Sequence, residues 1–152
     1  MTITQKLAEL GITLPAVPGP FGTYVPAKRC GSLVYVAGQL PMKDGAMLAE
    51  GRVPMACGIE QARACARQCV VNALAAVQTL PGGVDQLAGV LRVGVFVASD
   101  PVFHQQPTVA NAASELLAEI FGDAGRHVRA AVGLAALPLN APVEIEFTFT
   151  TA

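Results

Sequence analysis

The end of the chain carries a period-two pattern, and this pattern constrains the fold more than any other feature. Between residues 143 and 150, a valine, an isoleucine and two phenylalanines alternate with two glutamates and two threonines. Such alternation predicts a β-strand that buries one face against helices and leaves the other face open. The glutamates of this strand, Glu144 and Glu146, are expected on the open face.

A single arginine stands in the apolar segment before this strand. Arg129 opens the stretch 129–147, RAAVGLAALPLNAPVEIEF, whose other charged residues are Glu144 and Glu146. A guanidinium in a largely apolar strand needs an anionic partner, either a carboxylate of the protein or one of a ligand. A structural ion pair is the simpler explanation, because buried charge is usually tolerated in pairs.

The face on which Arg129 lies bears on this choice. If the large apolar residues of the strand expected at 128–135 face the helices, Arg129 shares the helix-free face with Glu144 and Glu146. That face is left for contact with other subunits, and binding clefts commonly form at such boundaries. In the ligand-binding alternative, Arg129 holds a carboxylate through two hydrogen bonds and Glu144 holds or activates a water.

Periodicity elsewhere in the chain predicts the rest of the fold. Apolar residues at three- and four-residue steps predict helices over 58–79 and 107–121. Further strands are expected at 23–29, 32–37 and 90–98, with a short strand near the turn Lys43-Asp44-Gly45. Two helices of this length cover one face of such a sheet. The sequence therefore predicts an α+β fold, a mixed β-sheet with two helices packed on one face.

Length and composition indicate one domain over residues 1–152 and an oligomer. Hydrophobic residues make up 53% of the chain and charged residues only 14%, too few to cover the surface of a small monomer easily. We expect the excess apolar surface to be buried between identical subunits. Residues 1–20 are expected to form a short amphipathic helix and an extension, of which the Pro/Gly-rich connector is 15–22.

Several function classes are disfavoured by the same composition. The net charge of −1 and the absence of tryptophan argue against a nucleic-acid partner. No apolar run is long enough to span a membrane, and the N-terminus is not a secretory signal, so a cytoplasmic location is expected. The cysteines lack CxxC spacing and a nearby histidine, so no metal is expected. They are expected mainly in the core, although the surroundings of Cys30 and Cys57 favour a lowered thiol pKa.

Four segments, in order, resemble the RidA/YjgF family of the chorismate-mutase-like fold. The family pattern Arg-x-x-Val-x-x-x-x-Leu-Pro-x-x-x-x-Val-Glu-Ile-Glu matches from Arg129 to Glu146. Residues 22–25 (GTYV) are similar to its Gly-Pro-Tyr segment, and 36–41 (VAGQLP) to its Ser-Gly-Gln-Ile-Pro. The helix near Asn111 resembles one that begins at a family asparagine. The resemblance covers about residues 20–150.

This resemblance implies a homotrimer whose sheets face a central axis, with active sites in the clefts between subunits. It also implies hydrolysis of enamine/imine intermediates to a 2-keto acid and ammonia, without a metal or organic cofactor. By position, Arg129 matches the carboxylate-binding arginine and Glu144 the glutamate that orients water. The residues that match the substrate-binding positions are Tyr24, Gly38, Ala131 and Asn111.

Two departures from the family keep alternatives open. Ala37 and Ala131 stand where a serine and a cysteine are common, which removes polar groups from the expected pocket. One alternative is a non-catalytic binder of small carboxylic acids. Another is a metal-free endoribonuclease, for which His127 is the candidate acid or base because it precedes Arg129 by two residues and would share its strand face.

Overall fold

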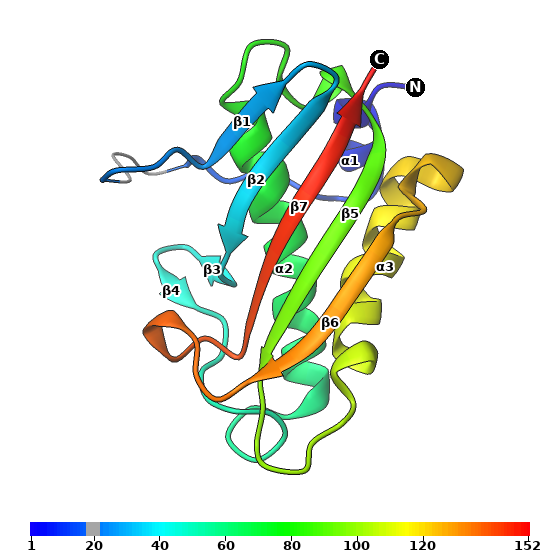
Figure 1. Cartoon of the computed structure of the whole chain (residues 1–152). Helices are drawn as coiled ribbons and strands as arrows, with labels where there is room; N and C mark the ends of the chain where they lie inside the picture. The colour runs from blue at the N-terminus through cyan, green and yellow to red at the C-terminus, as the bar shows by residue number, and fades with distance from the viewer. Residues whose placement is uncertain (18–21) are drawn as a thin grey trace.

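The computed structural model, which describes residues 1–17 and 22–152, contains a five-stranded sheet covered on one face by helices (Figure 1). The order across the sheet is β1-β2-β7-β5-β6, with β6 parallel to β5 and all other neighbours antiparallel. The strands are β1 (Ala27–Cys30), β2 (Leu33–Gln39), β5 (Leu87–Ala98), β6 (Val128–Leu134) and β7 (Val143–Thr151). The predicted mixed sheet is confirmed.

The predicted short strand is a small separate hairpin. It consists of β3 (Met42–Lys43) and β4 (Ala46–Met47), joined at Asp44 and Gly45, which both have positive φ. The strand expected at 23–29 begins only at Ala27, directly after Pro26, whose nitrogen has no hydrogen to donate. The connector expected at 15–22 lies partly outside the described residues.

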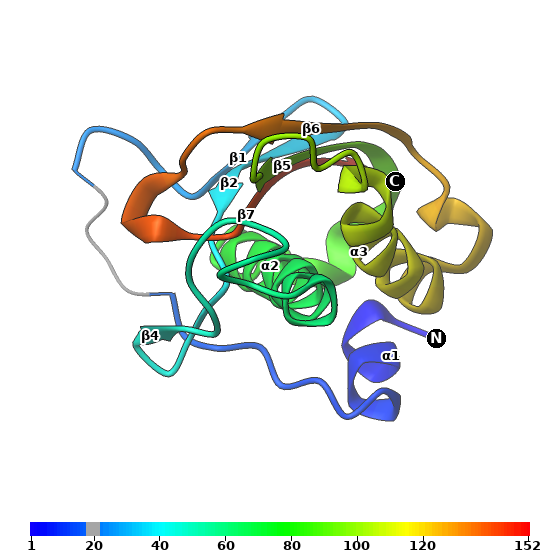
Figure 2. The ribbon, with the colours of Figure 1, turned by 90° about the horizontal axis from the view of Figure 1, so that it is seen from below.

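Two helices form the layer behind the sheet, as Figure 2 shows from below. They are α2 (Ile59–Gln78) and α3 (Gln106–Phe121), close to the predicted bounds. Ion pairs between Arg63 and Glu115 (3.1 Å) and between Arg67 and Glu119 (3.4 Å) link their outer surfaces. The expected N-terminal helix is α1 (Ile3–Glu9), which contacts α3 and the short 3-10 helix η1 (Gly83–Gln86).

The alternation of the last strand is confirmed by burial. The apolar side chains of β7 at 143, 145, 147 and 149 are at most 2% exposed and face the helices. The glutamates and threonines between them are half-buried on the other face, which Figure 1 shows toward the viewer. We call this helix-free side of the sheet the open face.

The orientation predicted for β6 is wrong. In the parallel register Arg129 lies beside Val93 and Ala131 beside Val95, and both valines are completely buried on the helix side. Arg129 therefore points toward α3 and not onto the open face. The large apolar side chains of β6 take the open face instead and stay partly exposed: Val128 (66%), Val132 (44%) and Leu134 (37%).

Close packing at the edge of the sheet explains this reversal. β6 is the edge strand, and α3 approaches it at its small residues. A Cβ atom placed on Gly133 would lie 2.8 Å from Nε2 of Gln106 in α3. A side chain at position 133 would meet Gln106, and the alternating strand places the valines and the leucine on the other face.

Candidate functional site

Neutral side chains of α3 hold the guanidinium of Arg129. Nη1 donates one hydrogen bond to Oδ1 of Asn111 (2.9 Å) and one to Oγ of Ser114 (3.1 Å). Arg129 is exposed, and it forms no ion pair with any residue in 1–17 or 22–152. The structural ion pair considered from the sequence is therefore wrong within this part of the chain. The positive charge remains available to an anion from outside.

Ser114 also contacts His127, and these residues border a hollow beside Arg129. His127 Nε2 lies 2.9 Å from Ser114 Oγ, and its Nδ1 lies 2.7 Å from the carbonyl oxygen of Gly125. The prediction that His127 shares a side of the strand with Arg129 is confirmed. The hollow has a volume of about 450 Å³, and its lining consists of Ser114, Ala118, Gly125, Arg126, His127 and Arg129.

Glu144 lies on the open face, in a space left by a glycine. A β-bulge between Val36 and Gln39 of β2 places Gly38 against β7. A Cβ atom on Gly38 would lie 2.2 Å from Oε1 of Glu144. Gly38 has no positive φ, so its lack of a side chain matters here for space and not for backbone conformation.

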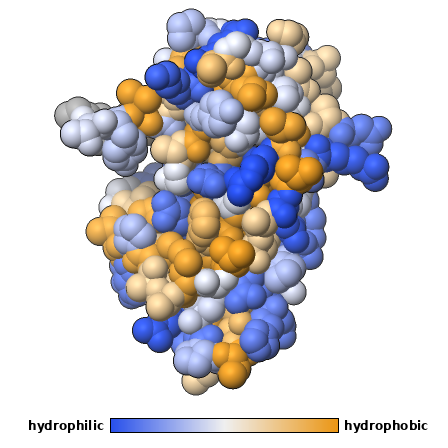
Figure 3. Space-filling model, viewed as in Figure 1, coloured by the Kyte–Doolittle hydropathy of each residue, from blue (hydrophilic) through white to orange (hydrophobic). Residues whose placement is uncertain are grey.

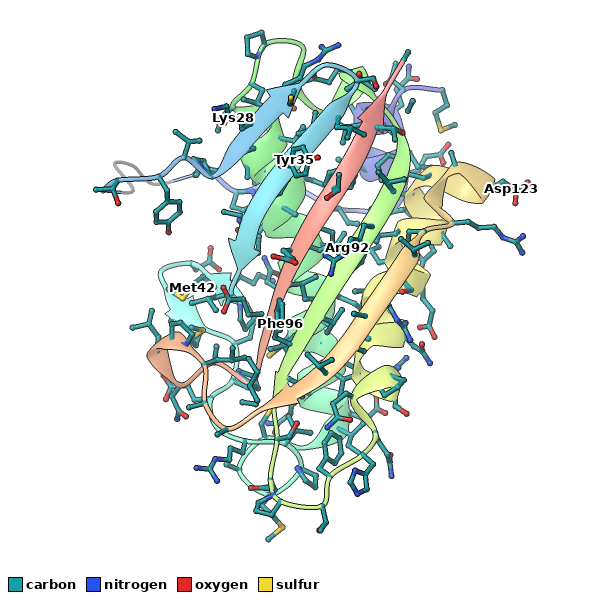
Figure 4. The ribbon with its side chains drawn as sticks, viewed as in Figure 1. Lys28, Tyr35, Met42, Arg92, Phe96 and Asp123 are labelled. Carbon is teal, nitrogen blue, oxygen red and sulfur yellow. The ribbon has the colours of Figure 1, made fainter. Side chains whose placement is uncertain are left out.

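The surroundings of Glu144 favour its protonated form. Burial raises the pKa of its carboxyl group above the ordinary glutamate value, and the negative charge of Glu146 raises this pKa further. Glu146 is itself paired with Arg92 at 2.9 Å, whereas the carboxyl group of Glu144 makes no hydrogen bond with the described residues. Figure 4 shows Arg92 on the open face, near the middle of the sheet. Glu144 thus presents on the open face a carboxyl group whose pKa is raised.

Arg129 and Glu144 do not meet within one chain. Arg129 lies on the helix side of β6, Glu144 lies on the open face of β7, and β5 separates the two strands. The two residues are also offset along the strands. Phe96 of β5 pairs with Glu144 on one side and with Val132 on the other, so Glu144 lies level with Val132 and not with Arg129. The two expected catalytic residues therefore form two half-sites. We call them the arginine half-site and the glutamate half-site.

The expected substrate-binding residues divide between these half-sites. Asn111 belongs to the arginine half-site, and Ala131 is half-buried on the same side of β6, where it packs against the core. Gly38 belongs to the glutamate half-site. Tyr24 and Gly38 also line a hollow of about 750 Å³ between α2, the end of β2 and residues 11–17.

Sequence reasoning missed Ser114, which links Arg129 to His127. The available signal was its spacing, since Ser114 follows Asn111 by one helical turn and both side chains therefore lie on one face of α3. The lowered thiol pKa expected for Cys57 is wrong, because burial raises the pKa of this thiol. Burial also raises the pKa of Cys65 to about 11. Both cysteines are buried in the core.

Residues 1–17 and 22–152 contain no group of three or more histidine, cysteine, aspartate or glutamate side chains placed to hold a metal ion. Within the same ranges, no helix combines the length and the apolar character needed to cross a membrane.

Comparisons with known proteins cover nearly the whole chain. Residues 4–150 match the family model described as "YjgF/chorismate mutase-like, putative endoribonuclease". Protein TCP17 of Trypanosoma cruzi is 37% identical over 145 residues, which are 95% of this chain and 91% of that protein.

Two solved structures extend the similarity to the fold. Atu1372 of Agrobacterium tumefaciens, a protein of unknown function, is 42% identical with a TM-score of 0.87, covering 99% of this chain and 92% of that one. A "putative endoribonuclease" of Shewanella oneidensis MR-1 is 27% identical with a TM-score of 0.91 and 99% coverage of both chains. By motif order, fold and sequence similarity, the chain belongs to the RidA/YjgF family.

Proposed function

We propose that this protein hydrolyses 2-imino acids to 2-keto acids and ammonia, in clefts between the subunits of a homotrimer. In this reaction water adds to the C=N carbon, the C–N bond breaks, and the nitrogen leaves as ammonia while the water oxygen becomes the keto oxygen. The observation that carries the proposal is the guanidinium of Arg129, which among the described residues forms no ion pair and bonds only to neutral acceptors of α3. A carboxylate next to the imine carbon is a suitable ligand for it.

The separation of the half-sites is the reason to place the reaction between subunits. The arginine half-site lies at the edge strand β6, and the glutamate half-site lies on the open face. A neighbouring subunit whose edge strand approaches this open face would bring the two together. The apolar side chains of Val128, Val132 and Leu134, with Tyr35 (50% exposed), support such a contact. Figure 3 shows apolar side chains gathered on this face around a charged centre.

Each residue then has a distinct part in the reaction. Arg129 binds the substrate carboxylate, and Asn111 helps to hold the guanidinium in place. Glu144 of the other subunit orients the attacking water and accepts its proton, for which a raised pKa is suitable. Gly38 leaves the space that this carboxyl group occupies.

Tyr24 and Ala131 complete the proposed pocket. Ala131 contributes through its backbone, and Tyr24, from the segment before β1, lines a hollow that Gly38 also lines. Ala37, which lines the same hollow, makes this pocket less polar than is common in the family, which favours a substrate with an apolar side chain.

Ammonia release from 2-iminobutyrate generated in situ tests the proposal. Wild type should accelerate the release, and Arg129→Ala should lose the acceleration. Glu144→Gln should lower kcat more than it raises KM, whereas Glu50→Gln, an exposed glutamate, serves as the matched control. Saturable binding of 2-oxobutyrate without turnover would instead identify a carboxylic-acid binder.

An endoribonuclease is the second candidate, and one observation favours it. His127 and Arg129 both contact Ser114, so a possible acid or base lies close to a possible phosphate ligand. Metal-free cleavage of RNA that His127→Ala abolishes, and that His104→Gln retains, would support this activity. Absence of cleavage by wild type would exclude it.

A further inference from the structure

The hydrogen bonds around Arg129 continue beyond its two direct partners. Nη1 donates to Ser114 Oγ at 3.1 Å, and Ser114 Oγ lies 2.9 Å from Nε2 of His127. Nδ1 of His127 lies 2.7 Å from the Gly125 carbonyl oxygen. A single chain of contacts therefore joins the guanidinium to the backbone just before β6.

Elementary hydrogen bonding gives this chain a direction. The Gly125 carbonyl can only accept, so Nδ1 of His127 carries a hydrogen. In the neutral imidazole Nε2 is then an acceptor, and the Ser114 hydroxyl donates to it. The remaining lone pairs of Ser114 Oγ are free to accept from Arg129. His127 thereby directs the Ser114 hydrogen away from the guanidinium and leaves Oγ to accept from Arg129.

The same contacts occupy one corner of the guanidinium and leave another free. Nη1 carries two hydrogens, and its two acceptors are Asn111 and Ser114. Neither Nε nor Nη2 of Arg129 has a hydrogen-bond partner in residues 1–17 and 22–152. These two nitrogens form the side edge of the guanidinium, where parallel N–H groups match the two oxygens of a carboxylate.

We propose that Ser114 and His127 are positioning residues that present the Nε/Nη2 edge of Arg129 to the carboxylate of the substrate. The inference rests on the proposed function, because it explains how the same arginine binds its ligand. Asn111 and Ser114 fix the guanidinium from one side, and His127 fixes Ser114. The guanidinium is then already oriented before the substrate carboxylate binds, so the Arg129 side chain loses less conformational freedom on binding.

Binding and turnover, measured separately in paired variants, test this inference. Titration calorimetry gives the Kd for 2-oxobutyrate, and ammonia release gives kcat. Ser114→Ala removes the acceptor, and we expect it to raise Kd about tenfold, as for the loss of one hydrogen bond to a charged group. His127→Ala should raise Kd less, because it acts through Ser114. Both variants should leave kcat within about twofold of wild type, since the chemical step lies elsewhere.

Conservative variants separate a positioning role from a merely structural one. Ser114→Thr keeps the hydroxyl and His127→Gln keeps an acceptor for it, so both should return Kd to near the wild-type value. His104→Gln is the matched control, because His104 is exposed and makes no hydrogen bond with the described residues. Circular dichroism confirms that each variant is folded.

The possible results distinguish this inference from the proposed function. Wild-type Kd in both alanine variants would overturn the inference and leave the proposed reaction intact. Unchanged Kd with a large loss of kcat would also overturn it, and would assign the Ser114–His127 pair to the chemical step. Wild type that binds 2-oxobutyrate but releases no ammonia would contradict only the reaction. Wild type that neither binds 2-oxobutyrate nor accelerates ammonia release would overturn both.

Discussion

The two half-sites of this protein position their ionisable side chains by different interactions. At the edge strand, Arg129 is exposed and is held by the hydrogen bonds that it donates to α3, so its charge is oriented without being neutralised. On the central strand of the sheet, the carboxyl group of Glu144 has no hydrogen bond from the described residues and lies in the space left by Gly38. Hydrogen bonding positions the cation, whereas packing space positions the carboxyl group.

This difference predicts how each half-site responds to substitution. The arginine half-site depends on the direction in which acceptors point, and it should be sensitive to the loss of a single polar atom. The glutamate half-site depends on empty volume and on neighbouring charge, and it should be sensitive to added atoms. Four experiments test the comparison, in order of decreasing expected effect.

The largest effect is expected from mixing two inactive variants. Arg129→Ala and Glu144→Gln each damage one half-site, and each retains the half-site that the other lacks. If both half-sites meet across a subunit boundary, co-refolding equal amounts should restore about a quarter of the sites, because each side is drawn at random. Ammonia release measures this recovery. Activity that never exceeds the sum of the separate variants would place both residues in one subunit's site.

Gly38→Ala tests whether empty space positions Glu144. The added Cβ would lie 2.2 Å from Oε1 of Glu144, so the flexible end of the glutamate must move. We expect kcat to fall by as much as about 100-fold, as when a reacting group is displaced by about 1 Å, with little loss of stability. Gly94→Ala is the matched control, because its Cβ would displace Glu146 and Arg92 instead. Equal losses in both variants would argue against a specific role for Gly38.

Glu146→Gln should shift the pH dependence of the reaction. Glu144 acts as a base only when it is ionised, so the acidic limb of the kcat/KM profile follows its pKa. Burial and then the charge of Glu146 raise this pKa. Removal of that charge lowers the pKa of Glu144 and moves the acidic limb to lower pH. A pH profile checks the direction, with Glu50→Gln as the control that leaves the limb in place.

The smallest effect is expected from the ion pair beside Glu144. Arg92 and Glu146 are 2.9 Å apart, but their side chains are 44% and 45% exposed, so water screens their attraction. Arg92→Gln should therefore change the free energy of unfolding by less than about 1 kcal/mol. Urea denaturation measures this change. A clearly larger loss would indicate that the open face is covered in solution and that the pair is buried there.

Much of the fold follows from periodicity along the chain. The alternation in β7 and the three- and four-residue steps in α2 and α3 are strong because each element buries one continuous face. The prediction failed at β6, an edge strand whose apolar residues do not mark the helix side. Its small residues Ala131 and Gly133 were the better indicator, because they allow α3 to approach.

The sequence by itself determined which residues are chemically unusual: an arginine in an apolar strand, and two glutamates on an alternating one. It also indicated their family through the order of the motifs. Only the tertiary structure decided which way each side chain points and what holds it. A strand pattern repeats every two residues, so an error in the facing of one residue reverses the predicted direction of every side chain on that strand. The contact between α3 and β6 resolves that ambiguity, and it places Arg129 beside Asn111 and Ser114 instead of Glu144.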